Sequence, residues 1–407
     1  MDQRTSERDA GATTEFEIDV VKLLLETMSN VDKQEREDAG TESLLAALVS
    51  GDSAAGSAIA PGMRASGSLS GSISARGTSV WVSDDTGDGA AGAPDDEREI
   101  DSVWREVRQD RASRLRWKNR KKEEAERESV ELPPVTGALR ACLRNALVNA
   151  REEGAVSVRV RHVAYALVEL PDTRAREAMV VEKVDISAAS AALDALRGSD
   201  TAPEPGSVLM LRKSGTFGKS GNPLTRKFSA WVFGGGAGFG SSVVSAVRAE
   251  ALRGAVRRGA PEQEPVDVLL GILALDRSLA VAGRELPEKL TGANQGAELL
   301  RRYGARLDAV ARVLFSATGA AEGELPLGDG TADRDRRLLH VAQYTASSQG
   351  SPTVGTTHLL AALLDKTGTD AESAAEIERV LAESGVDVAA LRAEPELRVP
   401  GGAARAA

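Results

Sequence analysis

The sequence predicts an all-α protein built from repeats, and three observations support this fold class. Aromatic residues make up only 3% of the chain, which favours Ala-, Leu- and Val-rich helices over a β-sandwich. Apolar residues recur at helical spacing in successive stretches. One short phrase also occurs four times along the 407 residues, each time after an amphipathic helical stretch. A chain of this length can form two or three domains with sizeable cores.

The repeated phrase is clearest at residues 354–363, which read Val-Gly-Thr-Thr-His-Leu-Leu-Ala-Ala-Leu. Related versions lie at residues 40–48, 160–167 and 266–273. A recurring unit of this size fixes the architecture, because each copy buries its apolar face against its neighbours. The four copies therefore predict four helical repeats.

The first repeat starts with a predicted helix over residues 15–29, after a disordered start at residues 1–13. Thr41 is a good N-cap for the next helix, and Glu42 suits the positive charge of a first helical turn. The helix at 15–29 presents one apolar face, formed by Phe16, Val20, Leu23 and Leu24.

An insertion is predicted at residues 51–135. Its first part, 51–97, is rich in Gly, Ser, Ala and Asp, so we expect it to be mostly mobile, with a short strand possible at 79–82. Its second part, 99–128, is highly charged and predicts a long surface helix. The basic residues of that helix are Arg105, Arg108, Arg111, Arg114, Arg116, Lys118, Arg120, Lys121 and Lys122.

The second repeat is predicted to begin with an amphipathic helix at 137–152, capped by Thr136, and to end with helices at 175–181 and 186–196. A break at 198–240 follows. It holds two strand-like runs, Ser207–Leu211 and Phe228–Phe233, which make a small β-hairpin possible.

The second half of the chain repeats the plan of the first. The tail after Pro395 is expected to be disordered. We expect further helices at residues 242–258, 296–303, 307–315, 333–348 and 371–383, with a last one ending at Leu391.

These phrases resemble the Clp amino-terminal repeat family, the substrate- and adaptor-binding domains of Clp-type ATPase unfoldases. The family's phrase is preceded by a helix similar to residues 338–343 and followed by an ending similar to Gly385-Val386-Asp387 and Lys183-Val184-Asp185. The resemblance implies that two repeats make one helical domain with pseudo-twofold symmetry. Four repeats then imply two tandem domains, at 14–198 and 239–394, joined by a linker or hairpin at 199–238 and followed by a disordered tail at 395–407.

The resemblance also implies a ligand. In the family, the acid of the phrase recognises the guanidinium of a phosphorylated arginine, and hydroxyls and N–H groups at the helix start hold the phosphate. The matching positions here are Glu42, Arg161, Asp267 and Thr357. Arg161 would repel a guanidinium, so the candidate ligand-binding residues are Thr41, Glu42, Asp267, Thr356 and Thr357. Capping of the helix by Thr41 and Glu42 is the simpler alternative.

Several activities are disfavoured by the sequence. Residues 213–220 approach a phosphate-binding loop but begin with Lys213 where glycine is required, which argues against ATP hydrolysis. Three histidines and one cysteine form no metal-binding spacing, and no catalytic triad motif is present, so we expect no metal, no cofactor and no enzyme activity. The histidines His162 and His358 are expected to be satisfied core residues.

Charge and composition bear on partners and location. The net charge of −10 argues against a general nucleic-acid binder, and no apolar run is long enough to span a membrane. A single cysteine, Cys142, excludes an intrachain disulfide and suits a reducing cytoplasm.

The resemblance therefore implies a non-catalytic binding protein that acts as an adaptor or a decoy. Its partners would be a Clp unfoldase, its adaptors or substrate proteins, including phosphoarginine-bearing ones. A second hypothesis is a scaffold that binds nucleic acid or an acidic protein through the basic helix at 99–128. A third is a degenerate ATPase remnant that binds nucleotide at 213–220.

Overall fold

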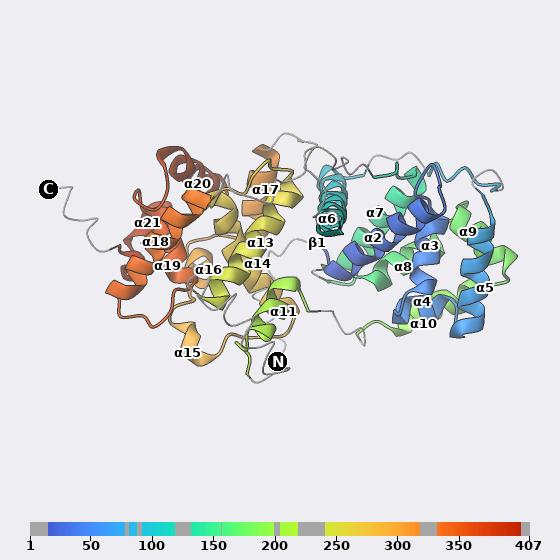
Figure 1. Cartoon of the computed structure of the whole chain (residues 1–407), viewed down its shortest axis with the longest axis horizontal. Coiled ribbons are helices and arrows are strands. Elements are labelled where there is room, and N and C mark those ends of the chain that lie inside the picture. The colour runs from blue at the N-terminus through green and yellow to red at the C-terminus, as the bar shows by residue number, and fades with distance from the viewer. Residues whose placement is uncertain are drawn as a thin grey trace. The chain divides into compact units, whose positions relative to one another are not determined.

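A computed structural model describes residues 15–77, 81–87, 92–118, 132–155, 157–198, 204–218, 241–317 and 332–399. The described residues are predominantly helical, which confirms the all-α fold class (Figure 1). Within them, strands are limited to β1 (Glu15–Phe16) and β2 (Ser157–Val158), which pair in parallel.

The chain divides into two compact units, one at Thr14–Pro203 and one that begins at Glu204. Each unit encloses a hydrophobic core of its own. The predicted domains began at residues 14 and 239. The second unit therefore starts earlier in the chain than the second predicted domain.

Nine helices make up most of the described part of the first unit. They are α2 (Ile18–Lys33), α3 (Thr41–Ser50), α4 (Ala54–Ile59), α5 (Gly62–Ala75), α6 (Pro94–Lys118), α7 (Gly137–Glu152), α8 (Val160–Glu169), α9 (Arg174–Val181) and α10 (Ile186–Ala195).

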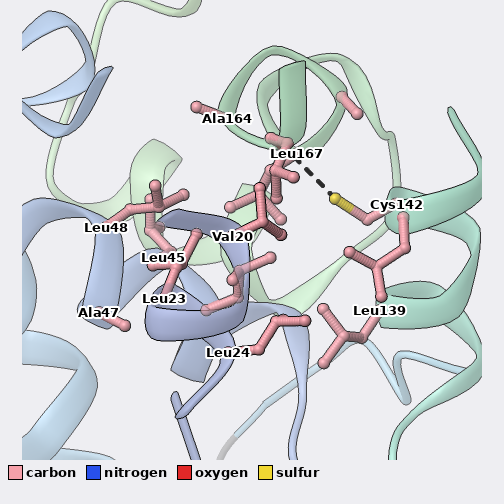
Figure 2. Packing of buried hydrophobic residues seen from close by; sticks show 14 of the residues in the cluster. Val20, Leu23, Leu24, Leu45, Ala47, Leu48, Leu139, Cys142, Ala164 and Leu167 are labelled. Carbon is pink, nitrogen blue, oxygen red and sulfur yellow. Dashed lines mark hydrogen bonds between the residues drawn. The ribbon is translucent and has the colours of Figure 1, made fainter. Parts of the chain in front are cut away.

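The core of the first unit lies where the two phrase helices, α3 and α8, meet the helices that precede them, α2 and α7. Figure 2 shows Leu24 of α2, Leu45 of α3, Leu139 of α7 and Leu167 of α8 converging on one apolar cluster. Cys142 lies in the same cluster, where its thiol donates to the backbone carbonyl of Val163 at 3.6 Å. The apolar spacing that predicted these helices is therefore the spacing that fills the core.

The insertion is more ordered than the sequence predicted. Residues 51–97 were expected to be mostly mobile, but they contain α4 and α5, and Leu69 and Ile73 of α5 are buried in the core. These two side chains are one helical turn apart, so a Gly- and Ser-rich helix still has an apolar edge to bury. Of the possible strand at 79–82, only Trp81 and Val82 are described, and neither is in a strand.

Helix α6 also differs from the expected surface helix. Its N-terminal half packs Ile100, Val103, Trp104 and Val107 into the core of the first unit. The charged residues were conspicuous in the sequence, whereas the sparse apolar positions determine which face is buried. Residues 119–128 of the predicted helix lie outside the described residues.

The second unit contains the two remaining phrase helices, α14 and α19. Its named helices are α11 (Gly206–Lys213), α13 (Ser242–Arg258), α14 (Pro265–Val281), α15 (Glu288–Thr291), α16 (Gly296–Arg302), α17 (Leu307–Ala317), α18 (Ala332–Ser348), α19 (Thr356–Leu364), α20 (Ala371–Glu383) and α21 (Val388–Ala393).

Helix α11 corrects the prediction of a β-hairpin. Ser207–Leu211 was read as a strand but lies in this helix, and Val208 and Leu211 are fully buried in the second core. A short apolar run is ambiguous between strand and helix, and packing against α13 decides between them here. The other predicted strand, Phe228–Phe233, lies outside the described residues.

The first residues of the predicted disordered tail are packed in the second unit. Pro395–Leu397 forms a 3-10 turn after α21, and Leu397 is buried in the second core. The predicted disordered start at 1–13 lies outside the described residues, and so do residues 400–407 of the tail that was predicted to be disordered over 395–407.

The burial of α11 gives a first testable prediction. Replacing Leu211 with Ala should destabilise the second unit by about 2–5 kcal/mol, because a fully buried leucine leaves a cavity. Urea unfolding would measure this loss. The matched control is Met210→Ala on the same helix, which removes a half-buried side chain and should cost clearly less. Equal effects would contradict the assignment of α11 to the core.

Candidate functional site at the starts of the phrase helices

All five predicted ligand-binding residues lie in the first turns of phrase helices, and all five are buried. Thr41 and Glu42 begin α3, Asp267 lies in the first turn of α14, and Thr356 and Thr357 begin α19. Their exposed fractions range from 0% to 5%. Each unit brings its own residues together with partners from other elements, and those partners determine what the site can do.

Thr41 joins two helices of the first unit. Its hydroxyl Oγ1 accepts a hydrogen bond from the backbone N–H of Ala175, at the start of α9, with a distance of 3.1 Å. The same hydroxyl donates to Asp85 Oδ1 at 2.6 Å, and the Thr41 N–H donates to Asp85 Oδ2 at 2.8 Å. The predicted N-cap role is therefore corrected, because the N-cap of α3 is Gly40 and Thr41 is the first helical residue.

Asp85 is the centre of this arrangement, and no sequence pattern predicted its role. Its carboxylate also accepts from Thr136 Oγ1 at 2.7 Å and from the Arg174 N–H at 3.2 Å, and its carbonyl accepts from the Ala138 N–H at 3.0 Å. One fully buried residue of the insertion thus satisfies donors at the starts of α3, α7 and α9. Helix N-termini carry unpaired N–H groups and partial positive charge, so a carboxylate is well suited to this position.

Glu42 is held by arginines of its own chain. Arg36 Nη1 donates to Glu42 Oε1 at 2.7 Å, and Arg174 Nη1 lies 3.8 Å from the same oxygen. Burial raises the pKa of Glu42, and the nearby charge of Asp85 adds to this, whereas the two arginines oppose it. In the part of the chain that the structure describes, Glu42 Oε2 is buried without a hydrogen-bond partner.

Asp267 is paired in the same way in the second unit. Arg258 binds it bidentately, from Nε to Oδ1 and from Nη2 to Oδ2, both at 2.8 Å. Asp267 Oδ2 also accepts the N–H of Glu264 at 2.8 Å, which satisfies the start of α14. Burial raises the pKa of Asp267, and the pairing with Arg258 opposes that shift. A guanidinium therefore occupies this carboxylate already.

The second repeat reverses the polarity of the pair. Arg161 Nη1 donates to Glu153 Oε1 at 3.1 Å, and a second, shorter contact joins Arg161 Nη2 to Glu153 Oε2. The acid thus comes from the end of the preceding helix and the base from the phrase. This pairing agrees with the expectation that Arg161 does not receive a guanidinium.

The fourth repeat has no charge at this position. Thr356 Oγ1 accepts a hydrogen bond from the Gly296 N–H at 3.1 Å, and Thr357 Oγ1 accepts one from the Gln295 N–H at 2.9 Å. Both threonine hydroxyls thus satisfy backbone N–H groups at the start of α16. The Thr356 N–H donates to Asn294 Oδ1 at 2.9 Å. Thr356 thus occupies the place that Thr41 has in the first unit, with a neutral amide oxygen where Asp85 stands.

His162 and His358 hold the starts of their helices. Nδ1 of each ring accepts a backbone N–H at 3.0 Å, from Arg159 and Gly355 respectively. Burial lowers the pKa of both residues. An Nδ1 that accepts a hydrogen bond carries no proton, so both rings are neutral capping groups in this structure.

The predicted basic patch is only partly described. Arg111 Nη2 pairs with Asp32 Oδ2 at 3.0 Å, whereas Arg114 is exposed. Arg105 and Arg108 are half-buried on α6. Arg116 and Lys118 belong to α6 without described side chains, and Arg120, Lys121 and Lys122 lie outside the described residues.

Other kinds of site are limited by the described residues. Among them, no cluster of histidine, cysteine or acidic residues could hold a metal ion, and no helix is long and apolar enough to cross a membrane. Of the possible nucleotide loop at 213–220, Lys213 ends α11 and residues 219–220 are not described.

Comparisons with known proteins do not name the family. The chain matches no protein-family model, no curated protein and no solved structure. What the site can do must therefore be argued from its own geometry.

The buried pair of Arg258 and Asp267 gives a second prediction. Arg258→Met should cost about 3–5 kcal/mol in urea unfolding, because it leaves a buried carboxylate without its partner. The double variant with Asp267→Leu should recover more than half of that loss. The control is Arg392→Ala, which removes an exposed pair with Glu378 and should cost at most about 1 kcal/mol. Loss of stability in the double variant equal to that in Arg258→Met would contradict this account.

His358 gives a third prediction, on pH. An unfolded histidine binds a proton near pH 6.5, whereas the pKa of folded His358 is lower, so its contribution to stability is full above pH 6.5 and declines as the pH falls below it. His358→Ala should therefore lose about 1–2 kcal/mol or more at pH 7, and the difference from the natural protein should shrink at pH 5. Urea unfolding at both pH values tests this, with His340→Ala, at an exposed position of α18, as control. A difference that does not change with pH would contradict it.

Proposed function

We propose that the protein is a non-catalytic substrate-, degron- or adaptor-binding protein of a Clp unfoldase–protease system, acting as an adaptor or a decoy. The observation that carries this proposal is the fourfold repeat of the phrase, in which every copy begins a helix that packs in the core of its unit. The family that the phrase resembles uses such domains to receive substrates and adaptors.

The contacts at the phrase helices shape the proposal. Glu42 and Asp267 already bind Arg36 and Arg258, so a phosphoarginine-bearing partner would have to share or displace an internal guanidinium. This competition is easiest at Glu42, because its Oε2 is unpartnered among the described residues, and its Oε1 accepts one hydrogen bond from Arg36 and one from the Ser43 hydroxyl. We therefore place a ligand of this kind in the first unit.

The chemistry of the chain supports a binding role in a reducing compartment. Its single thiol, Cys142, is buried, and burial raises its pKa further above the ordinary range, so it is a poor nucleophile. The cytoplasm is the location that fits this cysteine usage.

A second candidate is the scaffold that binds an acidic partner through α6. It is favoured by one observation: α6 is fixed to the core by Val103 and Val107 while Arg114 is exposed. This candidate predicts binding that weakens steeply with salt and is lost when Arg108 and Arg114 become Gln. Adaptor binding through the phrase helices should survive those two changes.

The proposed function predicts a change in proteolysis without catalysis by the protein itself. Added to a Clp unfoldase and protease with a model substrate, it should bind the unfoldase saturably in biolayer interferometry. It should raise the degradation rate if it is an adaptor and lower it if it is a decoy. Substrate with phosphorylated and unmodified arginines should be compared, using Glu42→Gln against Asp267→Asn.

Two outcomes would overturn the proposal. One is hydrolysis of ATP or peptide by the pure protein. The other is an absence of both binding and any change in degradation rate.

A further inference from the structure

The segment of residues 81–87, called the strap below, contacts the start of α3, the first phrase helix. Its first residues are anchored to Arg76 and Glu177. The ring of Trp81 lies under Arg76, 5.1 Å from the guanidinium carbon, and the N–H groups of Val82 and Ser83 lie 2.8 and 3.4 Å from Glu177 Oε2. The side chain of Val82 is 91% exposed. Trp81 also packs against the first hydrophobic core, whereas the contacts of Val82 and Ser83 with Glu177 are polar and can be replaced by water or a ligand.

Asp85 is the one fully buried residue of the strap, with an exposed fraction of 0%. Its carboxylate takes four hydrogen bonds, from the Thr41 and Arg174 N–H groups and the Thr41 and Thr136 hydroxyls, at 2.6 to 3.2 Å. Such a set of converging N–H and O–H donors is what a free oxyanion finds at helix N-termini. Asp85 has a backbone φ of 57°, a left-handed conformation that is uncommon for a residue other than glycine. This strained backbone conformation occurs at the residue whose carboxylate accepts the four hydrogen bonds.

The second unit shows that this frame does not require an acid from elsewhere in the chain. There the Thr356 N–H donates to Asn294, two residues before the start of α16. The pairing of Thr356 with Gly296 matches the pairing of Thr41 with Ala175, at 3.1 Å in both units. The first unit differs because its acceptor is a full negative charge delivered by the insertion.

A second feature of the site is a buried carboxylate oxygen without a hydrogen-bond partner among the described residues. Glu42 Oε2 is buried, has no hydrogen-bond donor among the described residues, and lies so close to Gly40 that a side chain at that position would clash with it. Its neighbour Thr41 binds Asp85. The site therefore combines an oxyanion position that the strap fills with a carboxylate oxygen that nothing described fills.

We propose that the strap is an autoinhibitory occupant of the first unit's site, in which Asp85 holds the position of a ligand's oxyanion, a carboxylate or a phosphoryl group. A ligand binds by displacing Asp85 and the strap, with its cationic part toward Glu42 Oε2. This inference concerns the regulation of the site used in the proposed function and rests on that function for its purpose. Its physical test needs no Clp component.

The test is chemical rescue of Asp85→Ala in the full chain. The variant leaves four buried donors without their acceptor, so its melting temperature should fall. Inorganic phosphate should raise that melting temperature saturably by several degrees, and by more than it raises that of the natural protein. Acetate is tested in parallel, with chloride keeping the ionic strength constant. Rescue by phosphate, acetate or both supports the proposal and tells which oxyanion fits. Rescue by neither overturns it.

The matched control is Asp84→Ala, one residue earlier in the strap. Asp84 is exposed, and its carboxylate receives hydrogen bonds from Thr86 alone among the described residues. Its response to phosphate should equal that of the natural protein. An equal response in Asp84→Ala and Asp85→Ala would show a nonspecific salt effect and overturn the proposal.

A second measurement serves if Asp85→Ala does not fold. In the natural protein, saturating phosphate should speed hydrogen exchange at the Val82 and Ser83 amides severalfold while the amides in the middle of α7 stay unchanged. Glu177→Gln, which weakens one anchor of the strap, should lower the phosphate concentration needed. Exchange that phosphate does not alter in either protein overturns the proposal. Loss of Clp binding with intact phosphate rescue would instead contradict only the proposed function.

Discussion

The structure depends on how buried helix starts are supplied with acceptors. An α-helix leaves its first N–H groups unpaired, and a domain that packs several helix starts against one another buries those groups away from water. In the first unit, Asp85 meets this requirement for α3, α7 and α9 together. In the second unit, Asn294 and the hydroxyls of Thr356 and Thr357 meet it between α19 and α16. These acceptors therefore hold the helix starts close to one another.

Charge pairing within the repeats shows which property is essential and which is free to vary. Three phrase helices bury one charged residue near their start, and each finds its opposite at or just after the preceding helix: Arg36 for Glu42, Glu153 for Arg161 and Arg258 for Asp267. The polarity differs between repeats, yet every charge is paired. Burial penalises an unpaired ion of either sign, so pairing is required while the order of acid and base is free.

Much of the fold could be predicted from the sequence, because regular apolar spacing identifies amphipathic helices. The helix expected at 242–258 has the bounds of α13, Ser242–Arg258. Two kinds of feature could not be predicted. The run at Ser207–Leu211 is too short for its period to separate helix from strand. The partners of the site were also hidden: Asp85 is 44 residues from Thr41 and 89 from Arg174, and nothing in a charged, Gly-rich segment marks one acid as buried. The phrase identified where the site lies but not what fills it.

Cys142 has a consequence for the chemistry that is open to this protein. It is the one cysteine of the chain. It is fully buried on α7, and its thiol donates a hydrogen bond to the backbone carbonyl of Val163 on α8. Burial raises its pKa, so the reactive thiolate is suppressed. Mixed disulfides with other proteins, glutathionylation and oxidation to sulfenic acid all begin from an accessible thiolate. In the folded protein Cys142 is therefore protected from these reactions, and a partner cannot reach it to form a mixed disulfide unless α7 and α8 separate.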